Sequence, residues 1–182
     1  MLTLRRAVVV SIFFAVLLGL AYPLAETGIA QGLFHHQANG SLGANGSSLI
    51  GQRWKGPEWF QGRPDPDNAM ASGPANLGPR SAALEKQVAA LVAAYRAEGV
   101  APTPDLVTGS GSGLDPDITP AGAYAQVDAV AKARGLAPRV VRALVGANIK
   151  GSQLGFLGNP YVNVLALNEA LARAAACPLA AR

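Results

Sequence analysis

The chain has 182 residues, of which 50% are hydrophobic and 14% are charged, and its formal net charge is +4 at pH 7. Its 15 basic residues are spread along the chain and form no Lys/Arg block, so the charge gives no indication of nucleic-acid binding. Cys177 is the only cysteine, which excludes an intrachain disulfide, so the fold must depend on packing.

An apolar stretch without charged side chains, Ala7 to Ala25, lies close to the N-terminus. A bilayer core about 30 Å thick needs roughly 20 apolar residues in a helix, and the stretch is about that long. Arg5 and Arg6 precede it and Glu26 is the next charged residue, so the positive-inside rule places the N-terminus in the cytoplasm. We predict a single-pass anchor in the plasma (inner) membrane, with the rest of the chain outside the cytoplasm.

A cleavable signal peptide is the alternative to this anchor, because both begin with basic residues and an apolar helix. The apolar stretch is longer than the usual signal core, no clear A-x-A cleavage site follows it, and Tyr22-Pro23 looks like a helix end at the membrane interface. These features favour an uncleaved anchor.

The segment after the anchor reads as a short helix and a linker. Ile29, Leu33 and Phe34 recur at helical spacing, so 27–34 should continue the helix. The stretch Asn39–Ser48 consists of turn-forming residues and is predicted to be a flexible linker. His35 and His36 have no third metal ligand at suitable spacing and are predicted to be solvated.

Both tryptophans lie in a segment rich in Gly and Pro, 48–80, which should be ordered but mostly irregular, with short strands or turns. Trp54, Trp59 and Phe60 alternate with polar residues and are predicted to pack inward as core. A partner-facing patch is the alternative, because interfaces also favour aromatic residues.

Helices alternate with short connections in the remaining chain. The first, Ser81–Glu98, is predicted from a helical stripe of apolar residues: Leu84, Val88, Leu91, Val92 and Tyr95. Asp105–Thr108 is predicted to be a short strand. A helix should follow Thr119 and end before Gly135, another should start at Pro138, and Asn163 should cap a last helix.

These elements predict an α+β fold with one N-terminal transmembrane helix and a single soluble domain of helices and short strands. The predicted boundaries are 1–6 for the cytoplasmic N-terminus, 7–25 for the transmembrane helix, 26–48 for the juxtamembrane helix and linker, 49–176 for the extracytoplasmic domain and 177–182 for the tail.

The polar motifs do not assemble an active site. Ser110-Gly111-Ser112-Gly113 can present backbone N–H groups to an anion, but it lacks the lysine of a phosphate-binding P-loop. Asp115 and Asp117 lack further calcium ligands at loop spacing and are more typical of turns and caps. The domain has no histidine to serve as the base of a catalytic triad, and Cys177 has no His or Asn nearby in sequence. An accessory subunit without catalytic activity is therefore favoured.

The order of several blocks resembles the C subunits of the Kdp potassium-transporting P-type ATPases over nearly the whole chain. One departure is Asp117, where the family commonly has His. The blocks that carry the resemblance are Leu49–Gln52, Phe60–Pro64, Ser72–Pro79, Leu106–Pro120, Gln126–Gly135 and Phe156–Leu171.

The resemblance implies a non-catalytic subunit of a high-affinity, ATP-driven potassium uptake complex. Its implied partners are a potassium-channel-like subunit, an ATP-hydrolysing P-type subunit and a small hydrophobic subunit. The family's role is to stabilise assembly and, as a catalytic chaperone, to raise the ATP affinity of the hydrolysing subunit. No cofactor of its own is implied, and ATP would be shared with the pump subunit through residues that match Ser110, Gly111, Ser112, Gly113 and Gln126.

The predicted topology conflicts with direct nucleotide contact, because it leaves Ser110 and Gln126 outside, where ATP is scarce. Outside the cell, Asp115 and Asp117 can instead attract cations toward a potassium entrance. Two other hypotheses stay open: an anchored extracytoplasmic binding or envelope protein unrelated to transport, and an anchored hydrolase, which the missing histidine and metal ligands disfavour.

Overall fold

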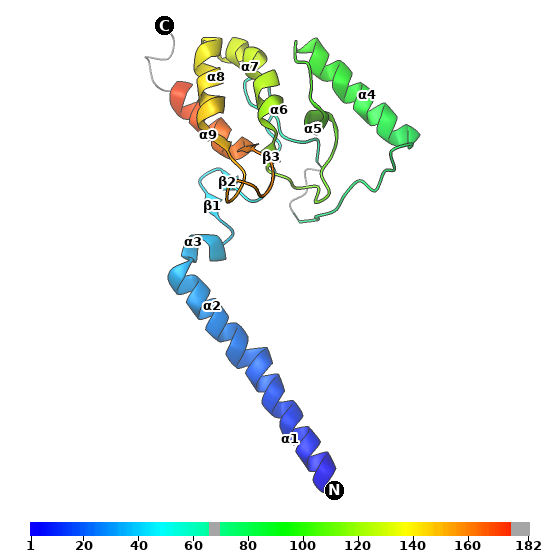
Figure 1. The fold of residues 1–182 in the computed structure, drawn as a ribbon, viewed down its shortest axis with the longest axis vertical. Helices are drawn as coiled ribbons and strands as arrows, with labels where there is room; N and C mark the ends of the chain where they lie inside the picture. The colour runs from blue at the N-terminus through cyan, green and yellow to red at the C-terminus, as the bar shows by residue number, and fades with distance from the viewer. Residues whose placement is uncertain (66–69, 176–182) are drawn as a thin grey trace. The chain divides into compact units, whose positions relative to one another are not determined.

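The computed structural model describes residues 1–65 and 70–175, and the chain forms two compact units, Met1–Ser47 and Ser48–Arg182 (Figure 1). The second unit is a mixed helix and short-strand domain, as predicted for an α+β fold. The predicted tail from Cys177 lies outside the described residues.

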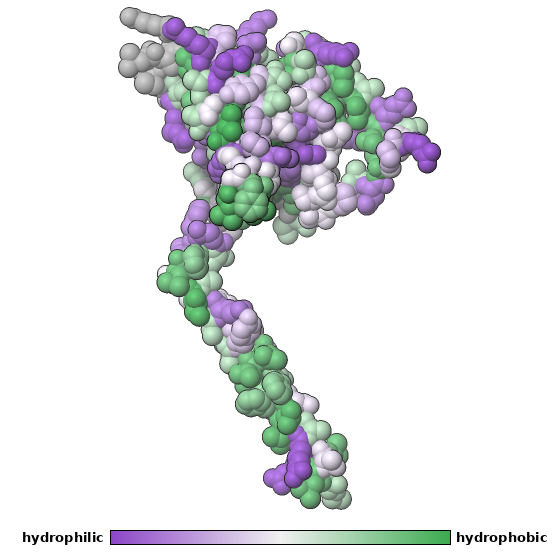
Figure 2. All heavy atoms as spheres, viewed as in Figure 1, coloured by the Kyte–Doolittle hydropathy of each residue, from purple (hydrophilic) through white to green (hydrophobic). Residues whose placement is uncertain are grey.

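The first unit begins with a continuous helix over Leu2–Leu33, which is 32 residues long and therefore long and apolar enough to cross a membrane. It consists of α1 (Leu2–Val16), a π-helical turn η1 (Leu17–Ala21) and α2 (Tyr22–Leu33). On the face of this helix that Figure 2 shows, most of the side chains are apolar.

The helix does not end at Tyr22-Pro23, and that prediction was wrong. Proline lacks an N–H group and its ring crowds the carbonyl one turn earlier, which breaks the regular hydrogen-bond ladder. The π-helical turn widens the helix just before this position, where the Tyr22 N–H donates to the Leu17 carbonyl. The helix therefore continues through Pro23, and the predicted helical character of 27–34 is confirmed up to Leu33.

The predicted linker contains local structure. After α3 (His35–Ala38), strands β1 (Leu42–Gly43) and β2 (Gly46–Ser47) form an antiparallel hairpin. The Ser47 hydroxyl closes it by donating to the Gly40 carbonyl at 2.6 Å. Ala44 and Asn45 form the two-residue turn of this hairpin, whereas Asn39-Gly40 lies in the turn between α3 and β1.

The second unit is built on a three-stranded antiparallel sheet with the order β3-β5-β4. β5 (Tyr161–Asn163) lies in the centre, between β3 (Asp117–Ile118) and β4 (Ile149–Lys150). In the register of the sheet, Val162 lies opposite Ile118 on one side and Ile149 on the other.

Six helices accompany the sheet in the described part of this unit. In Figure 1, α6 to α9 gather around the sheet, whereas α4 lies apart from them and contacts α5. The helices are α4 (Ala82–Ala97), α5 (Pro104–Val107), α6 (Pro120–Ala125), α7 (Val127–Arg134), α8 (Pro138–Ala147) and α9 (Val164–Ala175). The core between them contains Phe60, Leu106, Ile118, Ala123, Val127, Val130, Ala131, Val141, Val145, Val162, Val164, Leu167 and Leu171.

The predicted helix boundaries are confirmed where a local cap defines them. The Thr119 hydroxyl accepts from the Gly122 N–H, and Gly135 ends α7 in the left-handed conformation with φ of 66°. Asn163 caps α9 by accepting from the Ala166 N–H at 3.1 Å. The helix after Thr119 is broken at Gln126, which separates α6 from α7.

The strand predicted at Asp105–Thr108 was wrong, because this segment forms the short helix α5. Pro104 occupies the first helical position, where its fixed φ and missing N–H cost nothing, and Asp105 lies in the first turn. Leu106 and Val107 are both buried, and they lie in one helical turn rather than in a strand.

The aromatic residues of the irregular segment, predicted to pack inward as core or else to form a partner-facing patch, differ in how far they are buried. Phe60 is fully buried in the core, while Trp54 packs against the core and is only partly buried. Trp59 stacks on Trp54 with ring centroids 4.8 Å apart, and the Arg134 guanidinium lies 4.0 Å from the Trp59 ring centroid.

A side-chain amide holds the buried backbone of Phe60. Asn168 on α9, which is fully buried, accepts from the Phe60 N–H at 2.9 Å and donates to the Phe60 carbonyl at 3.0 Å. This pairing satisfies both backbone groups of an extended residue that no strand accompanies, as burial requires.

Replacing Asn168 by Ala should destabilise the domain by roughly 3 kcal/mol, because it leaves two buried backbone groups without partners. Urea unfolding of the full chain in detergent, followed by tryptophan fluorescence, measures the change. Asn148→Ala is the matched control, since Asn148 donates only to the Leu144 carbonyl one turn earlier, and it should cost less than about 1 kcal/mol. Equal losses in both variants would contradict the assigned role of Asn168.

A second buried polar group, the Asp105 carboxylate, joins α5 to the start of α6. It is 7% exposed, and it accepts from the Thr103 hydroxyl and from the Thr119 N–H at 2.7 Å. A Cβ on Gly122 would lie 2.7 Å from this carboxylate, so α6 needs glycine there. Burial raises the pKa of Asp105, but the hydrogen bonds from Thr103 and Thr119 outweigh it, and the net pKa lies below its ordinary value.

The lowered pKa of Asp105 predicts acid sensitivity. Because the folded pKa is the lower one, its stabilising contribution is present above the unfolded pKa of about 4 and is lost as the pH falls through the folded pKa. Asp105→Asn should reduce the free energy of unfolding at pH 7 by about 1–3 kcal/mol and flatten its decline below pH 4. Denaturant unfolding between pH 3 and pH 7 tests this, with Asp128→Asn on the exposed face of α7 as control; an unchanged acid slope in Asp105→Asn would refute it.

Candidate functional site

The predicted anion-binding loop, Ser110–Gly113, folds around a carboxylate of its own chain. Asp65 accepts from the Ser110 N–H at 2.6 Å, from the Ser110 hydroxyl at 2.6 Å and from the Asp115 N–H at 3.0 Å. Gly109 packs against the same carboxylate, since a Cβ at that position would lie 3.3 Å from an Asp65 oxygen. The loop therefore has an internal anion where a P-loop would hold phosphate.

The serine hydroxyls of the loop are also engaged internally. The Ser110 hydroxyl accepts from the Gly113 N–H at 2.8 Å, and the Ser112 hydroxyl accepts from the Leu114 N–H at 3.2 Å. The Ser112 carbonyl accepts from the Gly73 N–H at 2.8 Å. These contacts give the loop one defined conformation in which Gly113 is buried, while Gly111 and Ser112 are exposed.

Gln126 is buried at the break between α6 and α7, and its amide pairs with the backbone of Gln61. Its Oε1 accepts from the Gln61 N–H at 2.8 Å, and its Nε2 donates to the Gln61 carbonyl at 3.1 Å. Nε2 also donates to the Gly122 carbonyl at 3.2 Å. The side chain is 2% exposed, so these three bonds account for its polar atoms inside the domain.

The two predicted motifs are thus connected through one extended segment, Phe60–Asp65. Asn168 pairs with the first residue of this segment, Gln126 pairs with Gln61, and the Ser110 loop holds Asp65. Arg63 adds a further connection by donating to the Gly109 carbonyl at 3.1 Å. Ser110 and Gln126, predicted from the family resemblance to hold nucleotide, make their polar contacts in the structure to this segment, and their role toward nucleotide stays a prediction.

Asp115 and Asp117, which were predicted to attract cations, have environments that differ from each other. Asp115 lies 3.7 Å from the Arg63 guanidinium and accepts from the Asp117 N–H at 3.0 Å. Asp117 is half-buried and accepts from the Asn163 side-chain amide at 2.9 Å. Burial, with a smaller contribution from the Asp115 charge, raises the pKa of Asp117 above its ordinary value. The pair's proposed attraction of cations stays a prediction.

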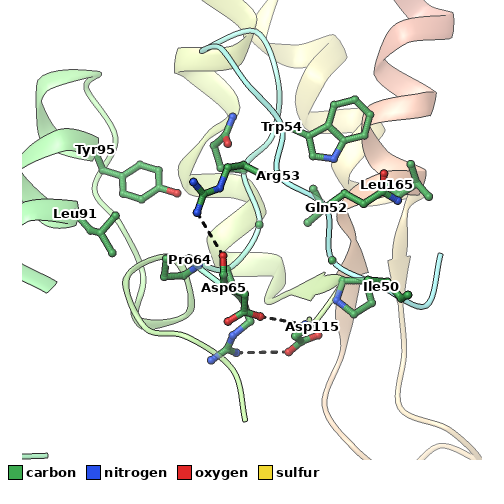
Figure 3. Close-up of a pocket in the computed structure, with 16 residues that line it drawn as sticks. Ile50, Gln52, Arg53, Trp54, Pro64, Asp65, Leu91, Tyr95, Asp115 and Leu165 are labelled. Carbon is green, nitrogen blue, oxygen red and sulfur yellow. Dashed lines mark hydrogen bonds and ion pairs between the residues drawn. The ribbon is translucent and has the colours of Figure 1, made fainter. Parts of the chain in front are cut away.

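A pocket of about 290 Å³ lies beside the Phe60–Asp65 segment (Figure 3). Its walls come from 50–54, from 61–65, from Leu91 and Tyr95 on α4, and from the start of α9. Asp65 and Asp115 border it, whereas neither the 110–113 loop nor Gln126 lines it. Burial raises the pKa of Tyr95 to about 12, with smaller contributions from the charges of Glu98 and Asp105.

In the described parts of the chain, no group of three His, Cys, Asp or Glu side chains comes together. In the N-terminal unit, the His35 ring contacts the Gln31 side chain at 3.0 Å. Cys177 lies outside the described residues.

Asp65 and Asn168 are the polar residues that sequence reasoning missed. Asp65 follows Pro64 directly, a pattern typical of turns, and it meets Ser110 across 45 positions of sequence. Asn168 is a polar residue on the buried face of the apolar helix α9. Because a buried polar side chain needs a hydrogen-bond partner, its position in the apolar pattern was the one signal of its role.

The structure defines a small α+β domain that follows one apolar helix, and buried polar side chains of this domain hydrogen-bond to its own backbone. The profile of the family described as KdpC, K+-transporting ATPase, c chain, matches residues 4–173. The chain is 51% identical over 180 residues to the potassium-transporting ATPase KdpC subunit of Caulobacter vibrioides (strain NA1000 / CB15N), covering 92% of this chain and 91% of that protein. It is 50% identical over 182 residues to the KdpC subunit of Sorangium cellulosum (strain So ce56), covering 92% and 96%. The chain therefore belongs to the KdpC family, which confirms the resemblance read from the sequence.

Replacing Asp65 by Ala should release the Ser110 loop from its internal anion. Hydrogen bonds to a carboxylate contribute about 1.5–3 kcal/mol each, so amide exchange at Ser110 and Asp115 should accelerate about tenfold or more. Hydrogen–deuterium exchange with mass spectrometry on the full chain in detergent measures this. As the control, Asp128→Ala removes an exposed carboxylate from α7 and should leave both amides protected. Unchanged exchange in Asp65→Ala would show that the loop keeps its conformation without the Asp65 carboxylate.

Proposed function

We propose that this chain is a membrane-anchored, non-catalytic subunit of an ATP-driven potassium uptake complex, and that its folded domain works in assembly outside the cytoplasm. The names of its relatives support the potassium-transporting complex. The apolar helix Leu2–Leu33 supports the anchor. The partners we propose are a potassium-channel-like subunit, an ATP-hydrolysing subunit and a small hydrophobic subunit.

The contacts of Ser110 and Gln126 are the observation that carries this choice of role. A direct contact with ATP requires free donors for phosphate, but the Ser110 N–H and hydroxyl donate to Asp65, and the Gln126 amide pairs with Gln61. Phosphate groups would also meet the negative charge of Asp65 itself. A catalytic chaperone that holds nucleotide through these residues would first have to displace Asp65 from the loop.

The charge pattern around the anchor supports the same role. Arg5 and Arg6 stand at one end of the helix and Glu26 near the other, so the positive-inside rule places the helix N-terminus in the cytoplasm. The domain then lies on the opposite side from the ATP pool. In this position it can stabilise the complex, while ATP hydrolysis belongs to another subunit.

An anchored binding protein unrelated to transport is the alternative, and it needs a ligand site of its own. The pocket beside Phe60–Asp65 measures about 290 Å³, at the lower limit of cavities that enclose small-molecule ligands. Such a protein would purify without partner subunits.

One experiment tests both the complex and the orientation. The full chain carries Ala90→Cys on the exposed side of α4 in a Cys177→Ala background, and it is co-expressed with the other subunits of the transporter. We expect the subunits to co-purify with it, and we expect a membrane-impermeant maleimide to label Ala90→Cys on intact spheroplasts. Thr3→Cys is the control, and it should react only after lysis.

The alternatives predict different results. Purification of the chain without other subunits would refute the proposed function and favour the binding protein. Co-purification with labelling of Ala90→Cys only after lysis would place the domain in the cytoplasm and make the ATP-chaperone role the leading one.

A further inference from the structure

The loop between β4 and β5, residues 151–160, exposes three large apolar side chains close together. Leu154 is 84% exposed, Phe156 is 75% exposed and Leu157 is 49% exposed. The other exposed large apolar residues of the described domain stand singly along the chain. Single apolar residues on a surface are ordinary, whereas a group of them marks a contact with another apolar surface. In Figure 1 this loop, coloured gold to orange, leads away from α7.

The backbone of the loop is hydrogen-bonded within the loop itself. Gln153 and Leu157 exchange N–H to carbonyl bonds at 2.8 and 2.9 Å, and the Phe156 N–H donates to the Gln153 carbonyl at 3.2 Å. The Ser152 hydroxyl donates to the Gly158 carbonyl at 2.8 Å. Backbone groups that leave water need such internal partners, because the apolar part of a bilayer offers them none. This loop can therefore enter an apolar phase at a lower cost than an open loop.

Leu154 adopts a backbone conformation that packing within the domain does not explain. Its φ of 53° lies in the left-handed region, which glycine and asparagine occupy at a lower cost than leucine. Because its side chain is mostly exposed, Leu154 contributes little to the core that could offset this strain. Backbone strain of this kind is concentrated at functional sites. The leucine at the tip of the loop therefore points to a contact outside the domain.

Lys150 and Tyr161 form the base of the loop. They are partners in the pairing of β4 with β5, and the Lys150 ammonium lies 5.8 Å from the centroid of the Tyr161 ring. The segment 149–163 contains no Asp or Glu, so its one charged residue is basic. An apolar tip beside an aromatic residue and a lysine is typical of proteins at a membrane surface, where lysine meets the lipid phosphate groups.

The chain from the apolar helix enters the domain at the strand that follows this loop. The Asn163 side-chain amide, at the end of β5, donates to the Ser48 carbonyl at 3.0 Å. Only residues 34–47 separate the helix end at Leu33 from Ser48. A helix that crosses a membrane thus keeps the loop at a high effective concentration near that membrane.

The size of the apolar tip favours lipid over a protein partner. Three side chains with these exposures present on the order of 400 Å². One partner of a stable protein interface buries about 800 Å², and the rim of such an interface supplies polar groups that pair across it. A bilayer requires no complementary surface, so a few apolar side chains are enough for a domain that is already tethered to it.

We propose that the loop 151–160 inserts Leu154, Phe156 and Leu157 into the surface of the lipid bilayer that its own anchor crosses, with Lys150 at the phosphate groups. This contact gives the domain a second attachment to the membrane and restricts its rotation about the linker. The inference rests on the membrane anchor of the proposed function, but not on the transport partners or on the side of the membrane.

Quenching of fluorescence by lipids tests this contact in the purified complex, reconstituted in vesicles of phosphatidylcholine and phosphatidylglycerol. An environment-sensitive fluorescent amino acid replaces Gln153, which leaves the three apolar side chains in place. Lipids that carry a nitroxide on the upper acyl chain should quench it at least about threefold more strongly than the same fluorophore at Ala133. Ala133 is the matched control, because it is exposed on α7.

Three variants separate insertion from a structural role of the loop. Leu154→Asn removes an apolar side chain, and because asparagine tolerates the left-handed conformation, the loop should keep its fold. It should reduce the quenching at residue 153 about twofold or more, whereas Leu77→Asn, at a singly exposed leucine, should leave the quenching unchanged. Lys150→Glu should weaken the quenching more in vesicles with phosphatidylglycerol than in phosphatidylcholine alone, since it sets like charges against each other.

The outcomes distinguish lipid from the other possible occupants. Equal quenching at residues 153 and 133, or unchanged quenching in Leu154→Asn, refutes the insertion and leaves the proposed function standing. An unchanged result in Lys150→Glu refutes the role assigned to Lys150.

Photo-cross-linking tests for a protein occupant. If p-benzoylphenylalanine at Gln153 cross-links a partner subunit or a second copy of the chain, protein covers the loop and the lipid contact is refuted. If the chain does not co-purify with other subunits, the proposed function is refuted instead, and the quenching is measured on the full chain alone in the same vesicles.

Discussion

The fold of the domain depends on the pairing of two buried side-chain amides with the backbone of Phe60 and Gln61. An extended segment inside a helical domain has no neighbouring strand to satisfy its N–H and C=O groups, and leaving them unpaired would cost several kcal/mol. Asn168 on α9 and Gln126 at the break between α6 and α7 supply these bonds. The segment can then carry Phe60 into the core and present Arg63 and Asp65 at the surface of the pocket.

Asp65 extends the same principle to the Ser110 loop. Backbone N–H groups and serine hydroxyls gathered in a Gly-rich turn attract anions in any protein, and the identity of the anion decides the function. Here the anion belongs to the chain, at 2.6 Å from the Ser110 N–H and hydroxyl. A motif that resembles a ligand site in sequence can therefore have a structural role and link segments that lie far apart in the chain.

Local signals predicted the features that local interactions determine. Thr119, Gly135 and Asn163 end or begin helices through contacts within a few residues, and their positions could be predicted. The strands could not, because two or three residues are too few for an alternating pattern. In the candidate site, Ser110 stood out as part of a Gly-rich run and Gln126 was named only through the family resemblance. Their partners lie 45 and 65 positions away and leave no trace in the local sequence.

The amide pairings also set the order in which the domain can fold. The Phe60 backbone lies 108 positions from the side chain that satisfies it, in the last described helix. Closing such a long loop loses conformational entropy before the contact contributes any favourable free energy, so contacts between distant residues slow folding. During synthesis the chain must hold Phe60 without its partner until α9 has emerged. The domain is thus expected to fold late and as a unit, and a chain truncated before α9 should remain a substrate for chaperones and proteases rather than form a partial domain.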